Sequence, residues 1–386
     1  MSGSTRSASS EIYIGLMSGT SLDGVDSVLV DLRSRPFLLG AGFLPYPKSL
    51  KAALLALHST SGDELHRAAL AGIELSRLYA KAADRLLEKH GVNAQAVSAI
   101  GCHGQTVRHR PGSGYSLQLG NPAWLAERTG IAVVADFRSR DIAAGGQGAP
   151  LVPAFHAAVF RDPRRHRVIV NLGGIANLTD LPRTGPVTGF DTGPGNVLLD
   201  AWARERLGHD FDRGGALAAR GRPVASLLKR LLADLYFHRS PPKSTGRDHF
   251  SFDWLRRFNV GRHRAEDVQA TLAELTACSV AKAIARHCPG AEEVYLCGGG
   301  VRNHDLVMRI ARELPGMKIS STERLGIHPD WVEAMAFAWL AQRSLKRRTG
   351  NLPEVTGAKG PRVLGAIYPA LPANYCEEKR KNKTEA

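Results

Sequence analysis

Hydrophobic residues along the chain gather into short runs separated by longer amphipathic stretches, a pattern typical of proteins that combine strands and helices. An apolar run over 11–18 ends in a turn rich in glycine and serine, and a second run over 26–32 follows at once. Two strands joined by such a turn predict a β-hairpin. Helical spacing of apolar residues then predicts helices over 49–58 and 63–90, before a buried strand over 96–104.

The same pattern starts again in the middle of the chain. Residues 167–181 contain an apolar run, a Gly-Gly turn and a second run. Strands and helices follow each of the two hairpins, which predicts two similar α/β domains. The later helices are expected over 196–207, 223–236, 268–287 and 331–347, with a polar loop over 239–248.

Three glycine-rich turns, within 18–26, 171–177 and 298–303, are candidate phosphate-binding sites. Backbone N–H groups of a tight turn converge on anions, and glycine lets the backbone approach a phosphate closely. The sequence has no Gly-Lys dipeptide, which excludes a Walker A loop, and the last turn lacks the third glycine of the dinucleotide fingerprint. Taken singly, each turn is more often a plain structural turn, because glycine and aspartate are common in turns for steric reasons.

The order of the turns is more informative than any one of them. Two hairpins that open two domains, followed by a late glycine turn, are the layout of actin-like ATPases. The pattern therefore predicts two similar actin-like (ribonuclease H-like) ATPase domains, with a nucleotide and sugar cleft between them. The expected limits are 11–165 and 166–371, with a disordered leader over 1–10 and a charged tail over 372–386.

Longer motifs narrow this interpretation to one family. In the same order along the chain, the sequence resembles the anhydro-N-acetylmuramic acid kinases in the segments 17–26, 101–107, 136–141, 171–177, 190–196, 298–303 and 333–338. The resemblance runs from about residue 12 to about residue 369. It implies a homodimeric kinase that uses ATP and Mg²⁺ to convert 1,6-anhydro-N-acetylmuramic acid and water to N-acetylmuramic acid 6-phosphate, in peptidoglycan recycling.

The residues expected to contact the nucleotide come from the three turns. They are Gly19, Thr20, Ser21, Leu22, Asp23, Gly24, Val25, Asp26, Asn171, Gly173, Gly174, Gly298, Gly299, Gly300 and Asn303. A carboxylate at Asp23 either caps the hairpin turn or holds Mg²⁺ through water, which suits a cation that gives up its water reluctantly.

Asp191 is the candidate catalytic residue. It ends an apolar strand and precedes a glycine turn, a place where active-site residues of open α/β sheets collect. A carboxylate there can accept a proton beside an attacking oxygen. The alternative, a cap on the helix that starts near Asn196, is disfavoured by the intervening Gly-Pro-Gly. In the family that the sequence resembles, this aspartate is the general base.

Substrate recognition is expected from a second group of side chains, namely His103, Gln105, Thr106, Arg138, Asp141 and Glu333. The planar fork of an arginine such as Arg138 or Arg140 suits the lactyl carboxylate of the implied sugar. A lone histidine in the position of His103 is more often a buried structural residue than a catalyst. The role of Glu333 is implied only by the resemblance, since a helical glutamate is most often solvated.

Composition adds little to this picture apart from a formal net charge of +15 over 386 residues. Clustered basic residues would indicate nucleic acid, but here they are dispersed, so a nucleic-acid partner is not expected. Apolar stretches are too short to span a membrane. Five cysteines without metal-site spacing predict a cytoplasmic protein with reduced thiols. The alternatives that remain are an ordinary N-acetylhexosamine kinase and a non-enzymatic actin-like ATPase.

Overall fold

The computed structural model describes residues 11–19, 21–58, 62–247 and 249–370. Contacts divide these residues into two compact units. Unit 1 contains the chain up to Phe155 and again from Glu333, and unit 2 contains His156–Val332. The predicted leader (1–10), the predicted charged tail (372–386) and Thr20 lie outside the described residues.

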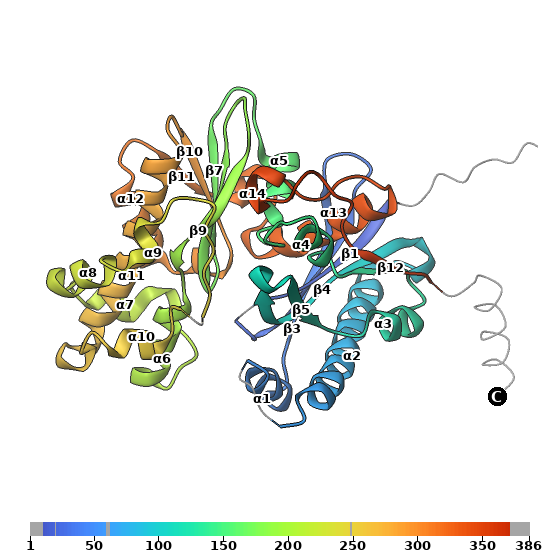
Figure 1. Ribbon diagram of the computed structural model, residues 1–386, viewed down its shortest axis with the longest axis horizontal. Helices are drawn as coiled ribbons and strands as arrows, with labels where there is room; N and C mark the ends of the chain where they lie inside the picture. The colour runs from blue at the N-terminus through green and yellow to red at the C-terminus, as the bar shows by residue number, and fades with distance from the viewer. Residues whose placement is uncertain (1–10, 20, 59–61, 248, 371–386) are drawn as a thin grey trace, which may run out of the picture. The chain divides into compact units, whose positions relative to one another are not determined.

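Unit 1 is built on a mixed sheet (Figure 1). The strand order of this sheet is β12-β6-β4-β1-β2-β3, with β5 paired to β4. Its strands are β1 (Ile12–Ser18), β2 (Gly24–Asp31), β3 (Phe37–Pro45), β4 (Val97–Arg110), β5 (Tyr115–Leu119), β6 (Val133–Ala135) and β12 (Ala366–Tyr368). Its helices are α1 (Lys48–Ala56), α2 (Glu64–His90), α3 (Pro122–Thr129), α4 (Ser139–Ala143), α5 (Val152–Phe160, which runs on into unit 2), α13 (Val332–Leu345) and α14 (Pro353–Thr356).

Unit 2 is built on a sheet with the order β11-β10-β7-β8-β9. Its strands are β7 (Arg167–Leu172), β8 (Ile175–Leu181), β9 (Thr188–Pro194), β10 (Glu293–Cys297) and β11 (Lys318–Ser321). Its helices are α6 (Val197–Leu207), α7 (Ala216–Arg220), α8 (Ala225–Leu232), α9 (Leu235–His238), α10 (Phe252–Arg256), α11 (Ala265–His287) and α12 (His304–Glu313).

The two sheets share one topology. In unit 1, β1 is antiparallel to β2 and β2 to β3, while β1 pairs in parallel with β4 and β4 with β6. In unit 2, β7, β8 and β9 form the antiparallel part, and β7, β10 and β11 the parallel part. This repeat confirms the predicted pair of similar actin-like α/β domains.

Helix α13 packs directly on the centre of the unit 1 sheet because two paired strand positions are glycines. Gly15 of β1 lies opposite Gly101 of β4. A Cβ atom on Gly15 would lie 1.9 Å from the carbonyl oxygen of Ala334, and one on Gly101 would lie 2.0 Å from that of Phe337. Glycine is therefore required where the helix backbone approaches the strands.

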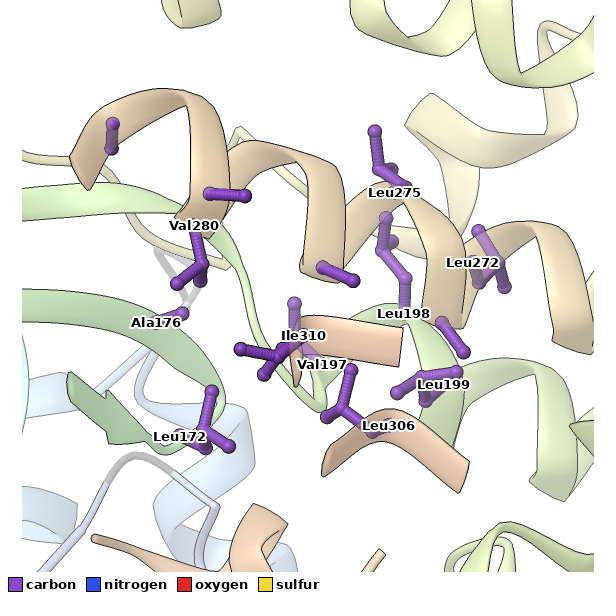
Figure 2. Packing of buried hydrophobic residues seen from close by; sticks show 14 of the residues in the cluster. Leu172, Ala176, Val197, Leu198, Leu199, Leu272, Leu275, Val280, Leu306 and Ile310 are labelled. Atoms are coloured by element: carbon purple, nitrogen blue, oxygen red, sulfur yellow. The ribbon is translucent and has the colours of Figure 1, made fainter. Parts of the chain in front are cut away.

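The core of unit 2 is formed by side chains from several helices and the sheet (Figure 2). Leu272 and Val280 of α11 meet Val197 of α6, Ile310 of α12 and Leu172 of β7 in this cluster. Burial of such aliphatic side chains contributes about 1.5–3 kcal/mol each relative to exposure. The cluster thus fixes the ends of β7 and the start of α6, where the predicted functional turns lie.

Two expectations differ from the structure. The predicted helix over 223–236 is wrong, because the chain forms α8 and α9 there. Asp234 separates the two helices by accepting a hydrogen bond from the backbone N–H of Tyr236 as the cap of α9. The predicted domains were also continuous in sequence, whereas residues from 333 onward belong to unit 1 by their contacts. The physical reason is that β12 pairs with β6 and α13 covers β1 and β4.

None of the helices in the described ranges combines the length and the apolar character that crossing a membrane requires.

Candidate active site

The first glycine turn connects β1 to β2 and is open around Gly19. Among the described residues other than its chain neighbours, an added Cβ on Gly19 would meet only atoms of Ser21, at 3.5 Å or more. The turn is closed by a hydrogen bond from the Leu22 N–H to the Gly19 carbonyl (3.4 Å), and the Ser21 hydroxyl donates to the Asp23 carboxylate (2.6 Å). Small side chains near the turn therefore leave the backbone accessible to a ligand at Gly19.

The residues that follow in this motif pack inside unit 1. Leu22 is buried and has a positive φ of 56°, and Val25 is fully buried. A Cβ on Gly24 would lie 2.4 Å from the Leu44 carbonyl oxygen, so β3 packs against this position. Asp26 lies within β2, opposite Met17 of β1. Any nucleotide contact by Leu22, Gly24 or Val25 would involve backbone atoms.

Three residues predicted to recognise the substrate come together in unit 1. The Arg138 guanidinium donates from Nη2 to Nε2 of His103 (2.8 Å), and the His103 ring packs on Phe337 with 4.6 Å between centroids. Glu333 lies one helical turn before Phe337 on α13. The sequence could not show that these segments, far apart along the chain, meet.

Burial controls the protonation of this cluster. It lowers the pKa of His103 to about 3, and the charge of Arg138 acts in the same direction. His103 is therefore neutral, and because Nε2 accepts from Arg138, the proton of the ring lies on Nδ1. Burial raises the pKa of the half-buried Glu333 carboxyl, which the positive charge of Arg138 opposes. The cluster offers a cation, a fixed neutral imidazole and a carboxyl whose proton affinity is increased.

Other predicted substrate residues are engaged within unit 1. Gln105 is fully buried; its Oε1 accepts from the Tyr46 hydroxyl (2.9 Å) and its Nε2 donates to the Gly19 carbonyl (3.1 Å). It thereby fastens the first glycine turn to β4. The hydroxyl of Thr106 accepts from Gln118 (3.1 Å). Asp141 has no solvent exposure, and Arg140 is exposed.

Asp191 lies in β9 of unit 2, opposite Asn177 of β8, next to an irregularity in the pairing. One carboxylate oxygen accepts a hydrogen bond from the Thr245 N–H (2.9 Å). Its backbone N–H donates to the Lys243 carbonyl (3.2 Å), and the Tyr236 hydroxyl donates to its carbonyl (2.7 Å). These bonds fix both the backbone and the carboxylate of the candidate catalytic residue.

The segment 243–247 is the part of the site that sequence reasoning missed. It lies in the predicted polar loop, and its run of lysine, serine, threonine, glycine and arginine was the available signal. Burial and the neighbouring Arg286 lower the pKa of Lys243, while the Asp191 carboxylate opposes that shift. The loop thus brings both a backbone donor and a cation to Asp191.

The second glycine turn of the chain, Gly173–Gly174, is held by the start of α6. The Gly173 carbonyl accepts from the Asn196 N–H (2.9 Å), and the Gly174 carbonyl accepts from the N–H groups of Gly195 and Val197 (2.9 and 3.0 Å). Because these carbonyl oxygens bond to α6, the position and orientation of the turn are fixed by the helix.

The late glycine turn packs on the end of β7, so unit 2 brings two of the predicted nucleotide turns together. A Cβ on Gly298 (φ +81°) would lie 2.3 Å from Oδ1 of Asn171, and one on Gly300 would lie 2.6 Å from Cβ of Leu172. Gly299 has open space on its Cβ side. Asn303 accepts from the Leu306 N–H (3.0 Å) and caps α12.

Among the residues that the structure describes, Asp23 is not part of a cluster of metal ligands. Within the described ranges, the one group of three suitable side chains consists of Glu274, Cys278 and Glu313. The carboxylate of Glu274 already accepts hydrogen bonds from Arg309 and Arg312, whose charges disfavour a cation. A single carboxylate at Asp23 would suit an ion that keeps most of its water ligands.

Two α/β units of one topology, each with a glycine turn between its first two strands, define the chain as a member of the actin-like class. The family model for anhydro-N-acetylmuramic acid kinase matches residues 11–370. The chain belongs to the anhydro-N-acetylmuramic acid kinase family.

Curated relatives match over nearly their whole length. The chain is 55% identical over 361 residues to an anhydro-N-acetylmuramic acid kinase of Nitrosospira multiformis, covering 93% of this chain and 99% of that protein. A protein of the same name from Thiobacillus denitrificans is 55% identical over 365 residues, covering 93% and 98%. Among solved structures, the activator of the 2-hydroxyisocaproyl-CoA dehydratase from Clostridium difficile with bound ADPNP has a TM-score of 0.45 at 14% identity, covering 87% of this chain and 97% of that one.

Proposed function

We propose that this protein phosphorylates 1,6-anhydro-N-acetylmuramic acid with ATP, opening the anhydro ring with water to give N-acetylmuramic acid 6-phosphate and ADP. The observation that carries the proposal is the 55% identity to kinases of this name over 93% of the chain. The geometry of unit 2 supports it, because the Thr245 N–H holds the Asp191 carboxylate and the Tyr236 hydroxyl holds the backbone carbonyl of the same residue.

In this reaction Asp191 takes a proton from the water that attacks the anomeric carbon. The C1–O6 bond breaks as the C1–O bond to water forms, and its electron pair passes to O6. This oxygen then attacks the γ-phosphorus, and ADP leaves with the electrons of the broken phosphoanhydride bond. The Thr245 N–H bond orients the carboxylate, and a base must be held in such a position to reach the attacking water.

The glycine turns would bind the nucleotide phosphates through their backbone, at Gly19, Ser21 and Asp23 in unit 1 and at Gly173, Gly174 and Gly298–Gly300 in unit 2. Thr20 is proposed to bind the nucleotide phosphates as well. Mg²⁺ would neutralise the charge that develops on the phosphates, and Asp23 is the residue that would hold it through water. His103, Arg138 and Glu333 would bind the sugar, with Arg138 pairing with its lactyl carboxylate.

Replacement of Asp191 by Asn tests the assignment of the base. The amide keeps the shape of the side chain but accepts no proton at the reaction pH, so we expect the rate to fall by about 10²–10⁴ while ATP still binds. Asp210→Asn, at an exposed carboxylate in the same unit, is the matched control and should keep its activity. Asp191→Asn activity within a few fold of wild type would contradict the proposal.

The fate of water tests the ring opening separately. In H₂¹⁸O, mass spectrometry should find the label in the sugar phosphate, at the anomeric oxygen, and none in the transferred phosphoryl group. A product labelled only by slow anomeric exchange would instead indicate direct phosphorylation of a free sugar hydroxyl. The rate at which the product gains label must therefore be compared with the rate for unlabelled N-acetylmuramic acid 6-phosphate incubated alone in H₂¹⁸O.

The assembly and location follow from the same proposal. We expect a cytoplasmic homodimer, which size-exclusion chromatography with light scattering would detect as a mass of twice 41.6 kDa. Although the net charge is +15, the protein should not retain duplex DNA at physiological salt, because its basic residues are dispersed.

A further inference from the structure

The guanidinium of Arg138 is held at two of its nitrogens. Nη1 donates to the Gly148 carbonyl (2.7 Å), and Nη2 donates to Nε2 of His103 (2.8 Å). A guanidinium is planar, so two anchors on different nitrogens fix the plane in which its donors lie. The orientation of Arg138 therefore depends on the position of the Gly148 peptide.

The position of Gly148 requires a glycine. Its φ is +66°, and a Cβ there would lie 2.7 Å from Cγ1 of Ile142. Its N–H donates to Oδ2 of Asp141 (2.8 Å). Gly148 thus links the two side chains, because its N–H binds Asp141 and its carbonyl binds Arg138. A shift at Asp141 would be passed to Arg138 through this glycine.

Asp141 is in turn held by the segment that follows α13. Oδ1 of its carboxylate accepts from Nδ2 of Asn351 and from the hydroxyl of Thr356, both at 2.7 Å. Further bonds join the same two segments: the Gln147 N–H donates to the Thr356 carbonyl (2.7 Å) and the Lys359 N–H to the Ala144 carbonyl (2.8 Å). Asp141 and Thr356 are 0% and 1% exposed.

Burying the Asp141 carboxylate costs free energy, and what the hydrogen bonds provide in return is a fixed orientation of this side chain. A buried carboxylate loses the hydration that it has in water, and hydrogen bonds only partly compensate for that loss. Three donors converge on Asp141, which leaves its carboxylate directed at the protein and away from any ligand. The network ends at Arg138, the side chain that we propose to pair with the substrate carboxylate.

We propose that Asp141 is a positioning residue that determines selectivity for a sugar with a carboxylate, because it orients Arg138 through Gly148. The inference rests on the proposed function. Preorganisation of the guanidinium lowers the ordering cost of binding, so the effect falls on affinity for the acidic sugar. Asn351 and Thr356 support Asp141 from the C-terminal segment of unit 1.

The test compares two substrates, 1,6-anhydro-N-acetylmuramic acid and 1,6-anhydro-N-acetylglucosamine, which lacks the lactyl group. Asp141→Asn places an amide N–H₂ against one of the three donors. We expect kcat/KM for the acidic sugar to fall by about 10–100-fold, chiefly through KM, because a positioned charged contact is worth about 1.5–3 kcal/mol. The KM for ATP and the activity on the neutral sugar should stay within about twofold.

A milder pair of variants protects the test against misfolding. Thr356→Val removes only the hydroxyl donor and should reduce the preference for the acidic sugar, while Thr356→Ser keeps the donor and should restore it. Equal losses on both sugars in Asp141→Asn and Thr356→Val, or no change in preference in either, would overturn the inference while the proposed function stands. A wild-type protein that phosphorylates neither sugar would overturn both.

Discussion

Replacement of Gly101 by alanine tests the close packing of α13 on β4. The added Cβ would lie 2.0 Å from the carbonyl oxygen of Phe337, 2.7 Å from its carbonyl carbon and 3.1 Å from Cβ of Ala341. Two of these three atoms are backbone, so no side-chain rotation can relieve the contact. Cβ atoms essentially never approach other atoms closer than 3.0 Å, and the helix must therefore move away by about 1 Å.

The cost follows from what α13 buries. Eight of its residues are no more than 1% exposed, namely Val332, Ala334, Met335, Ala336, Phe337, Ala338, Leu340 and Ala341. A gap of 0.5–1 Å forfeits about a quarter to a half of the dispersion energy at each contact. We expect Gly101→Ala to lower the free energy of unfolding of unit 1 by about 3 kcal/mol, at the upper end of the usual cost of overpacking.

Urea denaturation followed by circular dichroism measures this loss, with Gly112→Ala as the control. Gly112 belongs to the same unit and has no atom within 4 Å of its Cβ position, so its replacement should change stability by less than about 0.5 kcal/mol. Gly101→Ala should also impair activity, because Phe337 packs on His103. An unfolding midpoint equal to that of Gly112→Ala would refute the reasoning.

Two further variants test buried charge in unit 2. Arg309 is 7% exposed and donates hydrogen bonds to Asp305 and Glu274 (2.6 and 2.7 Å). In urea denaturation, Arg309→Met should therefore lower the free energy of unfolding by about 3–5 kcal/mol. The control Arg256→Met, at an exposed arginine, should lower it by less than about 1 kcal/mol. Burial lowers the pKa of His156 to about 3, so between pH 6.5 and 3 the unfolded chain binds a proton there that the folded chain does not. The stability that this group contributes is therefore lost as the pH falls below 6.5. Between pH 7 and pH 5, the free energy of unfolding of His156→Gln should fall by about 2 kcal/mol less than that of the wild type. Equal losses in the two proteins would contradict the assignment.

Local patterns predicted the elements whose signal does not depend on distant neighbours. The hairpin of β1 and β2, the long amphipathic α2 and the second hairpin of β7 and β8 occur where expected. Strand β3 was missed because its sequence, FLLGAGFLP, contains no polar side chain and therefore shows no alternation of apolar and polar residues. A helical pattern over 223–236 concealed the cap at Asp234 that divides it.

The sequence identified which residues belong to the candidate site better than it predicted what each of them does there. Asp191, His103, Arg138 and Glu333 were recognised from motifs, and the structure places the last three in one cluster. Gln105 and Asp141 have the polar character of ligand-binding residues, yet both are buried in bonds within unit 1. Partners such as Asn351 and Thr356 lie more than 200 residues from Asp141, and no local pattern reveals them.

The return of residues 333–370 to unit 1 has a consequence for synthesis on the ribosome. Unit 2 is one continuous segment, His156–Val332, and all of its strands and helices can pair once that segment has emerged. Unit 1 must wait for α13 before Gly15 and Gly101 are covered, and for β12 before β6 has its second neighbour. Domains usually complete their folding in the order of translation. In this chain the middle segment can complete its fold first, whereas the sheet of unit 1 lacks α13 and β12 until residues 333–370 have been translated.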